Sequence, residues 1–180
     1  MYLCASSREE YCTSLTHDQL CKIAAVNVHG VSGQRLIKGT NGKIAVIGRT
    51  MGDYARRNVY GVVDYTKELR GDGFKYDTEL FAGPQIKQAW KDEIEELKLR
   101  YQTDHLSPEV IRTTEFYRQN LAWAQKLVDQ GYTVIDVGNP NGWPEPSAFY
   151  DGEMATVFND LTAARTVNLK TLDCPTATRH

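Results

Sequence analysis

The sequence predicts an α/β fold: a small parallel sheet with helices on both faces, in a Rossmann-like, three-layer arrangement. Two short runs of β-branched and other apolar residues, 43–48 and 132–137, are typical of buried central strands. Between and after them lie longer segments with helical periodicity, and glycine or proline marks most of their ends. This alternation of strands with helices favours parallel pairing, because a helix carries the chain back across the sheet between two parallel strands.

The expected elements follow one another in the order β-α-β-α-α-β-α. Their bounds are a strand at 43–48, a helix at 53–70, a strand at 74–81, a helix from Pro84, a helix from Ser107 to Gly131, a strand at 132–137 and a helix at 148–158. Ser107 and Ser147 are expected N-caps, since a serine oxygen accepts a hydrogen bond from the first turn of a helix. The longest helix has an apolar stripe that predicts its buried face, formed by Val110, Tyr117, Leu121, Ala124 and Val128.

Three segments are expected along the chain: a head or entry segment at 1–41, an α/β effector body at 42–160 and a tail at 161–180. Residues 27–42 contain four glycines and no helical periodicity, which is typical of a linker or irregular entry segment. The tail is polar and rich in threonine, with weak structural signals. The sequence thus predicts one principal folding unit, at 42–160.

Composition and charge indicate a soluble globular domain. The chain has 180 residues, of which 41% are hydrophobic, and this is enough apolar material for one core. Its formal net charge is −2, which disfavours a non-specific nucleic-acid binder, because such binding needs clustered cations. No apolar run approaches the roughly 20 residues of a membrane span. The first residues also lack the basic-then-apolar pattern of a signal peptide.

The four cysteines lie near the two ends of the chain, at Cys4, Cys12, Cys21 and Cys174. The first three are spaced too widely for ordinary zinc knuckles, which have two to four residues between ligands. A Cys4–Cys12 bond, a Cys12–Cys21 bond, or one joining the head to Cys174 fits the pattern better, with free thiols as the alternative. Between Cys21 and Cys174 there is no cysteine, so the body is expected to fold without internal cross-links.

Two segments follow the predicted central strands, at the edge where open parallel sheets bind ligands. The first is 48–52, in which a glycine stands on either side of Arg49, Thr50 and Met51. Backbone N–H groups there can hold a phosphate, with Arg49 as counter-charge and Thr50 beside it. The segment lacks the Gly-Lys-Ser/Thr ending of a P-loop and the third glycine of a dinucleotide fingerprint. A tight turn with a solvated arginine is the structural alternative.

The second segment, 136–147, begins with Asp136 at the end of an otherwise apolar strand. A carboxylate there is costly unless it is hydrogen-bonded, so it either takes part in chemistry or caps the turn that follows. Asn139 and Trp143 lie in the proline-rich loop, and the indole ring can stack on a planar base. A core position under the loop is the alternative for Trp143.

Glu153 is the strongest catalytic candidate, with Asp136 and Ser147 beside it as further candidates. On the last helix it shares a face with Phe149 and Val157, which favours a partly apolar setting, and Tyr150 flanks it. A carboxylate near an apolar cleft suits general-base work or the stabilisation of a developing cation. A boundary glutamate satisfied by a cap or by Arg49 is the alternative.

Asp104 and His105 form a second candidate site, as the acid and base of a nuclease that would also use Asp136 and Glu153. They precede the Ser107 cap, in a loop between two helices, where exposed surface residues are the simpler interpretation.

The segments 38–52 and 131–142, together with Ser147-Ala-Phe-Tyr-Asp-Gly-Glu153, resemble the variable C-terminal toxin modules of bacterial polymorphic toxins, of the contact-dependent-inhibition and Rhs types. The resemblance covers about 38–158. It implies a toxin that is secreted or delivered from a cell surface, acts in the cytoplasm of a target bacterium and is neutralised by a cognate immunity protein.

The spacing from Ser147 to Glu153 is also similar to the Ser-to-Glu element of TIR-type NAD hydrolases. That similarity implies cleavage of the N-glycosidic bond of NAD or a related nucleotide. Glu153 would stabilise the ribosyl centre, Arg49 would bind the phosphates, and Trp143 or Tyr150 would stack a ring. No metal or cofactor is expected, and NAD enters as a substrate. The alternatives are a nuclease that cleaves tRNA, other RNA or DNA, with nucleic acid as its partner, and a non-enzymatic binding domain.

Overall fold

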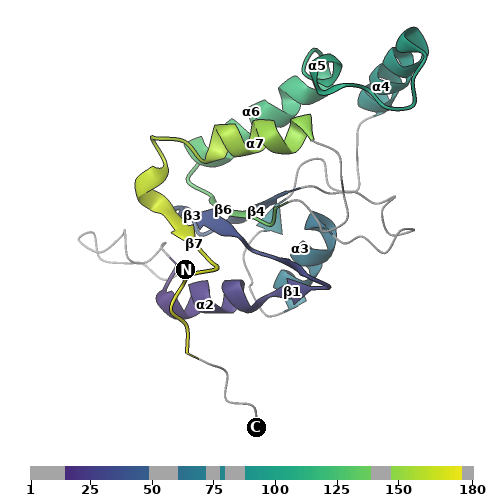
Figure 1. Cartoon of the computed structure of the whole chain (residues 1–180). Helices are drawn as coiled ribbons and strands as arrows, with labels where there is room; N and C mark the ends of the chain where they lie inside the picture. Colours follow the sequence, from purple (N-terminus) through teal and green to yellow (C-terminus); the bar gives the residue numbers. More distant parts are fainter. Residues whose placement is uncertain (1–14, 49–60, 72–77, 80–87, 139–146, 176–180) are drawn as a thin grey trace.

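The computed structural model describes residues 15–48, 61–71, 78–79, 88–138 and 147–175, and the structural statements below concern these ranges. Their main feature is a five-stranded sheet, and a two-stranded antiparallel sheet of β1 (Asn27–Val28) and β2 (Val31–Ser32) accompanies it (Figure 1). Across the main sheet the strands are β5 (Thr78–Glu79), β4 (Ile44–Ile47), β6 (Thr133–Asp136), β3 (Arg35–Ile37) and β7 (Thr166–Asn168).

The main sheet is mixed rather than parallel. β4 pairs in parallel with β5 and with β6, as the two apolar runs predict, and Ile47 lies opposite Asp136. β3 is antiparallel to both β6 and β7, so that Arg35 lies opposite Asp136 on one side and Asn168 on the other. The expectation of a parallel sheet is therefore correct for β5, β4 and β6 and wrong for β3 and β7.

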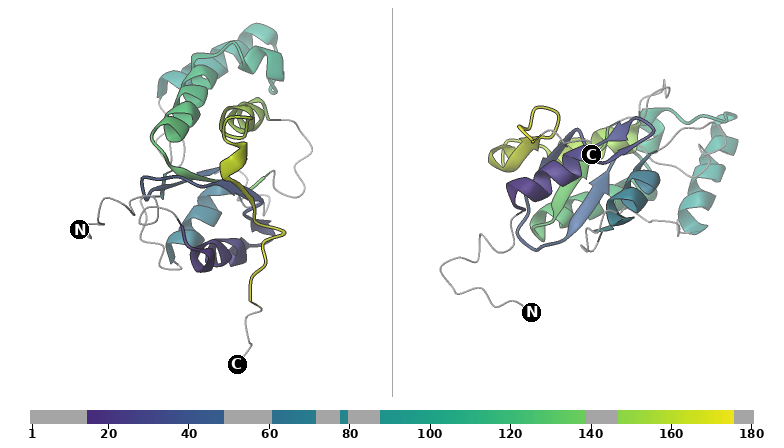
Figure 2. Two further views of the ribbon diagram at one scale, coloured as in Figure 1. Left: turned by 90° about the vertical axis from the view of Figure 1, so that its left-hand side faces the viewer. Right: turned by 90° about the horizontal axis from the view of Figure 1, so that it is seen from below.

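Helices pack against both faces of this sheet (Figure 2). On one face α2 (His17–Ala25) and α3 (Val62–Gly71) cover a core that includes Ile44 and Val46 of β4. On the other, α6 (Glu115–Asp129) and α7 (Ala148–Val157) cover Ala45 and Ile47. Successive side chains of a strand point to opposite faces, so a strand covered on both sides needs an uninterrupted apolar run.

Several predicted helix ends agree with the structure. α3 ends at Gly71, and α4 (Gln88–Tyr101) lies within the helix expected after Pro84, whose start falls outside the described residues. Gly131 has a φ of +75° and directly follows the C-cap of α6. This left-handed conformation is what favours glycine after a helix.

The helix expected from Ser107 to Gly131 is in fact two helices. Ser107 caps only α5 (Pro108–Ile111), and Thr114 then begins α6 by accepting a hydrogen bond from the Tyr117 N–H at 3.0 Å. The Glu93 carboxylate from α4 accepts hydrogen bonds from the first two N–H groups of α6, at 2.7 and 3.1 Å. Of the predicted apolar stripe, Ala124 is fully buried, whereas Val110, Tyr117, Leu121 and Val128 are half-buried.

The boundary predicted at residue 41 does not separate two packing units. Leu36 and Ile37 of β3 are fully buried in the main sheet, and Ile23 of α2 lies in the same core as β4. The predicted tail also contributes, through the 3-10 helix η2 (Ala163–Arg165) and the edge strand β7. The three short strands between 27 and 37 were not visible in the sequence because each has only two or three residues.

A disulfide joins Cys21 of α2 to Cys174, with Cα atoms 5.6 Å apart and a sequence separation of 153. This is the predicted alternative in which the head is bonded to Cys174, and Cys4 and Cys12 lie outside the described residues. Of the helices in the described ranges, none has the length and apolar character that would let it cross a membrane.

Candidate functional site

The candidate site lies where β4 and β6 end against α7. Asp136 is the last residue of β6, and Gly48 directly follows β4. Ser147 caps α7, as predicted, and its Oγ accepts a hydrogen bond from the Tyr150 N–H at 3.3 Å. Tyr150 and Glu153 are three residues apart on this helix, so their side chains lie on the same side of it, toward the ends of the strands.

Asp136 is the centre of the hydrogen-bonding network. Its side chain is almost completely buried, and its Oδ1 accepts hydrogen bonds from the Tyr150 hydroxyl at 2.9 Å and from the Gly138 N–H at 2.8 Å. Its Oδ2 lies 3.5 Å from Nε of Arg35. Burial is the largest influence and raises the pKa of this carboxyl, although the two hydrogen bonds and the arginine partly oppose it. The bond from Gly138 confirms that Asp136 caps the turn after β6.

Glu153 is the more strongly perturbed carboxyl. It is 7% exposed, and burial raises its pKa to about 8, with a further upward contribution from the negative charge of Asp136. Asn120 of α6 and the Gly48 N–H lower this pKa by interacting with the carboxylate. The Asn120 Nδ2 atom is itself buried and makes no hydrogen bond of ordinary geometry, so this stabilisation is incomplete.

Arg35 brings a positive charge to the site, and it was missed from the sequence because residue 35 was assigned to a linker. Its guanidinium lies 4.0 Å from the centre of the Phe158 ring, and its Nη2 is 3.9 Å from the Met154 sulfur. Its side chain is 39% exposed, so one edge of the site reaches solvent. The pairing of β3 with β6 places this residue directly opposite Asp136.

Close packing of α7 on α6 fixes the position of Glu153. A Cβ at Gly152 would lie 2.7 Å from Leu121 and 2.8 Å from the Tyr117 hydroxyl, so a larger residue would force these side chains to move. One turn earlier, the Phe149 ring packs against Phe116, with ring centres 4.8 Å apart. The residue before Glu153 is thus a glycine at the point where α6 and α7 are in contact.

The structure brings together Asp136, Tyr150 and Glu153 from the predicted set and adds Arg35 and Asn120. The only signal for Asn120 was a polar residue on the buried side of an amphipathic helix. Four predicted binding residues, Arg49, Thr50, Asn139 and Trp143, lie outside the described residues. The alternative in which Glu153 is paired with Arg49 therefore also concerns a residue outside the described ranges.

Asp104 and His105 do not join this site. Both side chains are exposed in the turn between α4 and α5, and the backbone of His105 is hydrogen-bonded to the Thr103 hydroxyl. The interpretation of these two residues as surface loop residues agrees with their exposure. Another group of potential ligand residues occurs elsewhere, where His17 lies beside the disulfide of Cys21 and Cys174.

The arrangement supports acid–base chemistry by two carboxyls with different environments. Burial raises the pKa of both carboxyls, but at Asp136 an arginine and two hydrogen-bond donors oppose this effect, whereas the pKa of Glu153 rises to about 8. Two carboxyls whose environments push their pKa values apart can divide acid, base and electrostatic roles between them.

A scan against protein-family models finds no match, and the searches of curated proteins and of solved structures return none either.

Proposed function

We propose that this chain is a toxin effector domain that hydrolyses the N-glycosidic bond of NAD or a related nucleotide. The observation that carries the proposal is the buried pair of Asp136 and Glu153 at the ends of two parallel strands, with the pKa of Glu153 raised to about 8. A group with a pKa near the working pH is well suited to take and return a proton. Open α/β sheets bind ligands at this same edge.

In the proposed reaction a water oxygen attacks the anomeric carbon of the ribose. The bond between that carbon and the base nitrogen breaks, and its electron pair leaves with the base, so that nicotinamide departs as a neutral molecule. The ionised Glu153 accepts the proton of the attacking water. The negative Asp136 stabilises the positive charge that develops on the ribosyl ring, and Tyr150 and Arg35 hold Asp136 in place.

These roles differ in one respect from the sequence-based expectation, in which Glu153 stabilises the ribosyl cation. Burial disfavours the charged form of both carboxyls, but Asp136 has an arginine and two hydrogen-bond donors that favour it, whereas the pKa of Glu153 rises to about 8. The electrostatic role therefore falls to Asp136, and proton transfer falls to Glu153.

The biological setting is proposed from the resemblance to polymorphic toxin modules. The chain would be secreted or delivered from a cell surface, act in the cytoplasm of a target bacterium and be neutralised by a cognate immunity protein. We also propose that the fold is a variation on the Rossmann-like, three-layer arrangement. The helices on both faces of the sheet support this assignment, and the antiparallel β3 and β7 are the variation.

The test is chromatographic analysis of NAD after incubation with the purified chain. Nicotinamide and ADP-ribose are the expected products, and Glu153→Gln should release neither. Glu109→Gln is the matched control, because it makes the same chemical change at an exposed position of α5 and should keep full activity. Intact NAD, with RNA or DNA degraded in parallel samples, would reject this proposal in favour of a nuclease.

A further inference from the structure

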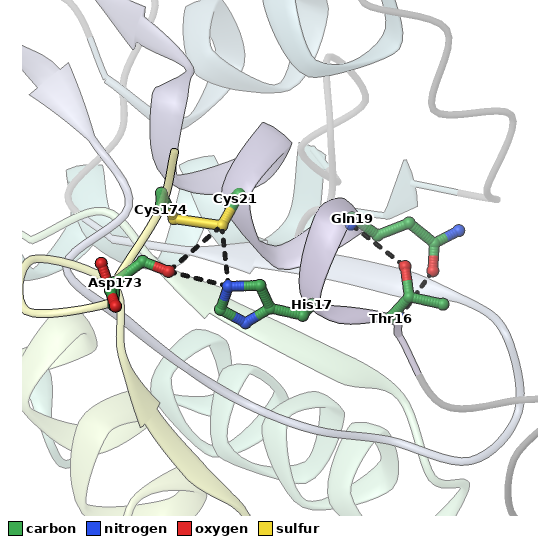
Figure 3. Close-up of a disulfide and its surroundings, with 6 residues drawn as sticks. All are labelled: Thr16, His17, Gln19, Cys21, Asp173 and Cys174. Carbon is green, nitrogen blue, oxygen red and sulfur yellow. Dashed lines mark hydrogen bonds between the residues drawn. A yellow bond between two sulfur atoms is a disulfide. The ribbon is translucent and has the colours of Figure 1, made fainter. Parts of the chain in front are cut away.

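A second cluster of reactive side chains lies on the opposite face of the sheet from α7, where α2 meets the C-terminal segment. Figure 3 shows the imidazole of His17 directed at the disulfide between Cys21 and Cys174. One ligand atom from each of the three residues lies within 4.8 Å of the other two. His17 and Cys21 are four residues apart on α2, so the helix itself holds them on one side.

The donor atoms suit a zinc ion. One imidazole nitrogen and two thiolate sulfurs form a common Zn²⁺ ligand set, and Zn–N and Zn–S bonds of about 2.0 and 2.3 Å place N and S roughly 3.6 Å apart in a tetrahedral site. The His17 Nε2 atom already lies 3.5 Å from the Cys21 sulfur. The helix therefore presents two of the ligands at the separation that the metal requires.

Cys174 completes the set once the disulfide is open. In a tetrahedral site two sulfurs lie roughly 3.8 Å apart. The Cα atoms of Cys21 and Cys174 are 5.6 Å apart, which lets the two side chains reach that separation by rotation. His17 Nε2 now contacts the Asp173 carbonyl oxygen at 2.7 Å, and it would exchange this contact for the metal.

We propose that reduction of this disulfide creates a Zn²⁺ site formed by His17, Cys21 and Cys174, with a water molecule in the fourth position. A dithiol reductant transfers two electrons and two protons to the S–S bond, giving two cysteine thiols, and itself becomes a cyclic disulfide. Binding of Zn²⁺ then releases the two thiol protons, and His17 contributes a neutral nitrogen. His17 is exposed and both cysteines are half-buried, so reductant and metal can reach them.

The proposal rests on this cluster and not on the enzymatic function proposed above. Both states link α2 to the C-terminal segment, one through a covalent bond and the other through a metal. The metal would therefore keep the ends of the described fold joined in a reducing environment, where disulfides are not maintained. Thr16, which caps α2 next to His17, holds the helix start in either state.

The test uses the full chain, reduced with dithiothreitol, desalted without oxygen and titrated with Co²⁺ as a spectroscopic probe, followed by Zn²⁺. We expect a thiolate-to-cobalt absorption band that Zn²⁺ abolishes, and no band with the oxidised chain. His17→Ala and Cys174→Ser should each weaken binding by more than about tenfold. His29→Ala and the double variant Cys4→Ser/Cys12→Ser should leave binding unchanged.

Three results would overturn the proposal. The first is a full-strength band in Cys174→Ser, and the second is loss of the band in Cys4→Ser/Cys12→Ser, since either would assign the metal to other cysteines. The third is the absence of cobalt binding by a reduced wild-type chain, whether or not it keeps its native circular dichroism.

Discussion

Glu153→Gln should raise the free energy of unfolding by an amount that grows as the pH rises above 4.5. The folded chain holds Glu153 protonated up to about pH 8, whereas the same group ionises near its ordinary pKa of 4.5 in the unfolded chain. Above pH 4.5 the unfolded state therefore binds fewer protons, and the free energy of unfolding falls by about 1.4 kcal/mol per pH unit. At pH 7 this penalty is on the order of 3 kcal/mol. A neutral glutamine, which still offers an oxygen to the Gly48 N–H, avoids it.

The assay is urea unfolding of both proteins at several pH values from 4 to 8. The stability of the two should be similar near pH 4, and the advantage of Glu153→Gln should grow to roughly 3 kcal/mol by pH 7. Near neutral pH this corresponds to a rise in Tm of roughly 6–12 °C. A variant that is less stable than the wild type at pH 7, or a difference that does not change with pH, would refute the assignment of Glu153 as a neutral buried carboxyl.

Three further predictions concern the surroundings of the site and the disulfide. Tyr150→Phe removes the hydroxyl that donates to Asp136, so the pKa of Asp136 should rise and the free energy of unfolding should fall by about 1–2 kcal/mol. Carbon NMR follows the titration of Asp136, and an unchanged titration would contradict the hydrogen bond. Gly152→Ala should lower the free energy of unfolding by about 1–3 kcal/mol in chemical unfolding, because its methyl group would overlap Leu121. The control Gly71→Ala, with no atom within 4 Å of its Cβ, should leave this free energy unchanged. Equal effects of the two variants would argue against the close helix contact. The bond between Cys21 and Cys174 closes a loop of 153 residues, so Cys21→Ser/Cys174→Ser should lower the free energy of unfolding by about 2–5 kcal/mol. If the wild type and this variant unfold at the same temperature without reductant, the bond does not contribute to stability.

The centre of the fold was predictable because its signals are local. β4 and β6 are apolar runs, and a strand covered on both faces requires such a run. Ser147 caps α7 through its own side chain, which accepts a hydrogen bond from the N–H of Tyr150, three residues further along the chain. From that cap the helical repeat places Tyr150 and Glu153 on one side, so half of the site followed from the sequence.

The rest of the site depends on contacts between distant parts of the chain. β3 has three residues, and nothing in Arg35-Leu36-Ile37 indicates that it pairs with β6, so the arginine beside Asp136 could not be foreseen. The break between α5 and α6 is partly of this kind, because Glu93 of another helix binds the first N–H groups of α6 in addition to the local cap by Thr114. The helical repeat indicated a partly apolar setting for Glu153, but the extent of its burial, which raises its pKa, depends on the packing of α6 against α7.

The most direct test of the central claim is the rate of nicotinamide release from NAD, measured from pH 6 to pH 9 with the wild type and with Glu153→Gln. If the ionised Glu153 is the general base, the wild-type rate should rise with pH through about 8, where this pKa lies, and the variant should be inactive throughout. A wild-type rate that does not depend on pH, or substantial release by Glu153→Gln, would contradict the account.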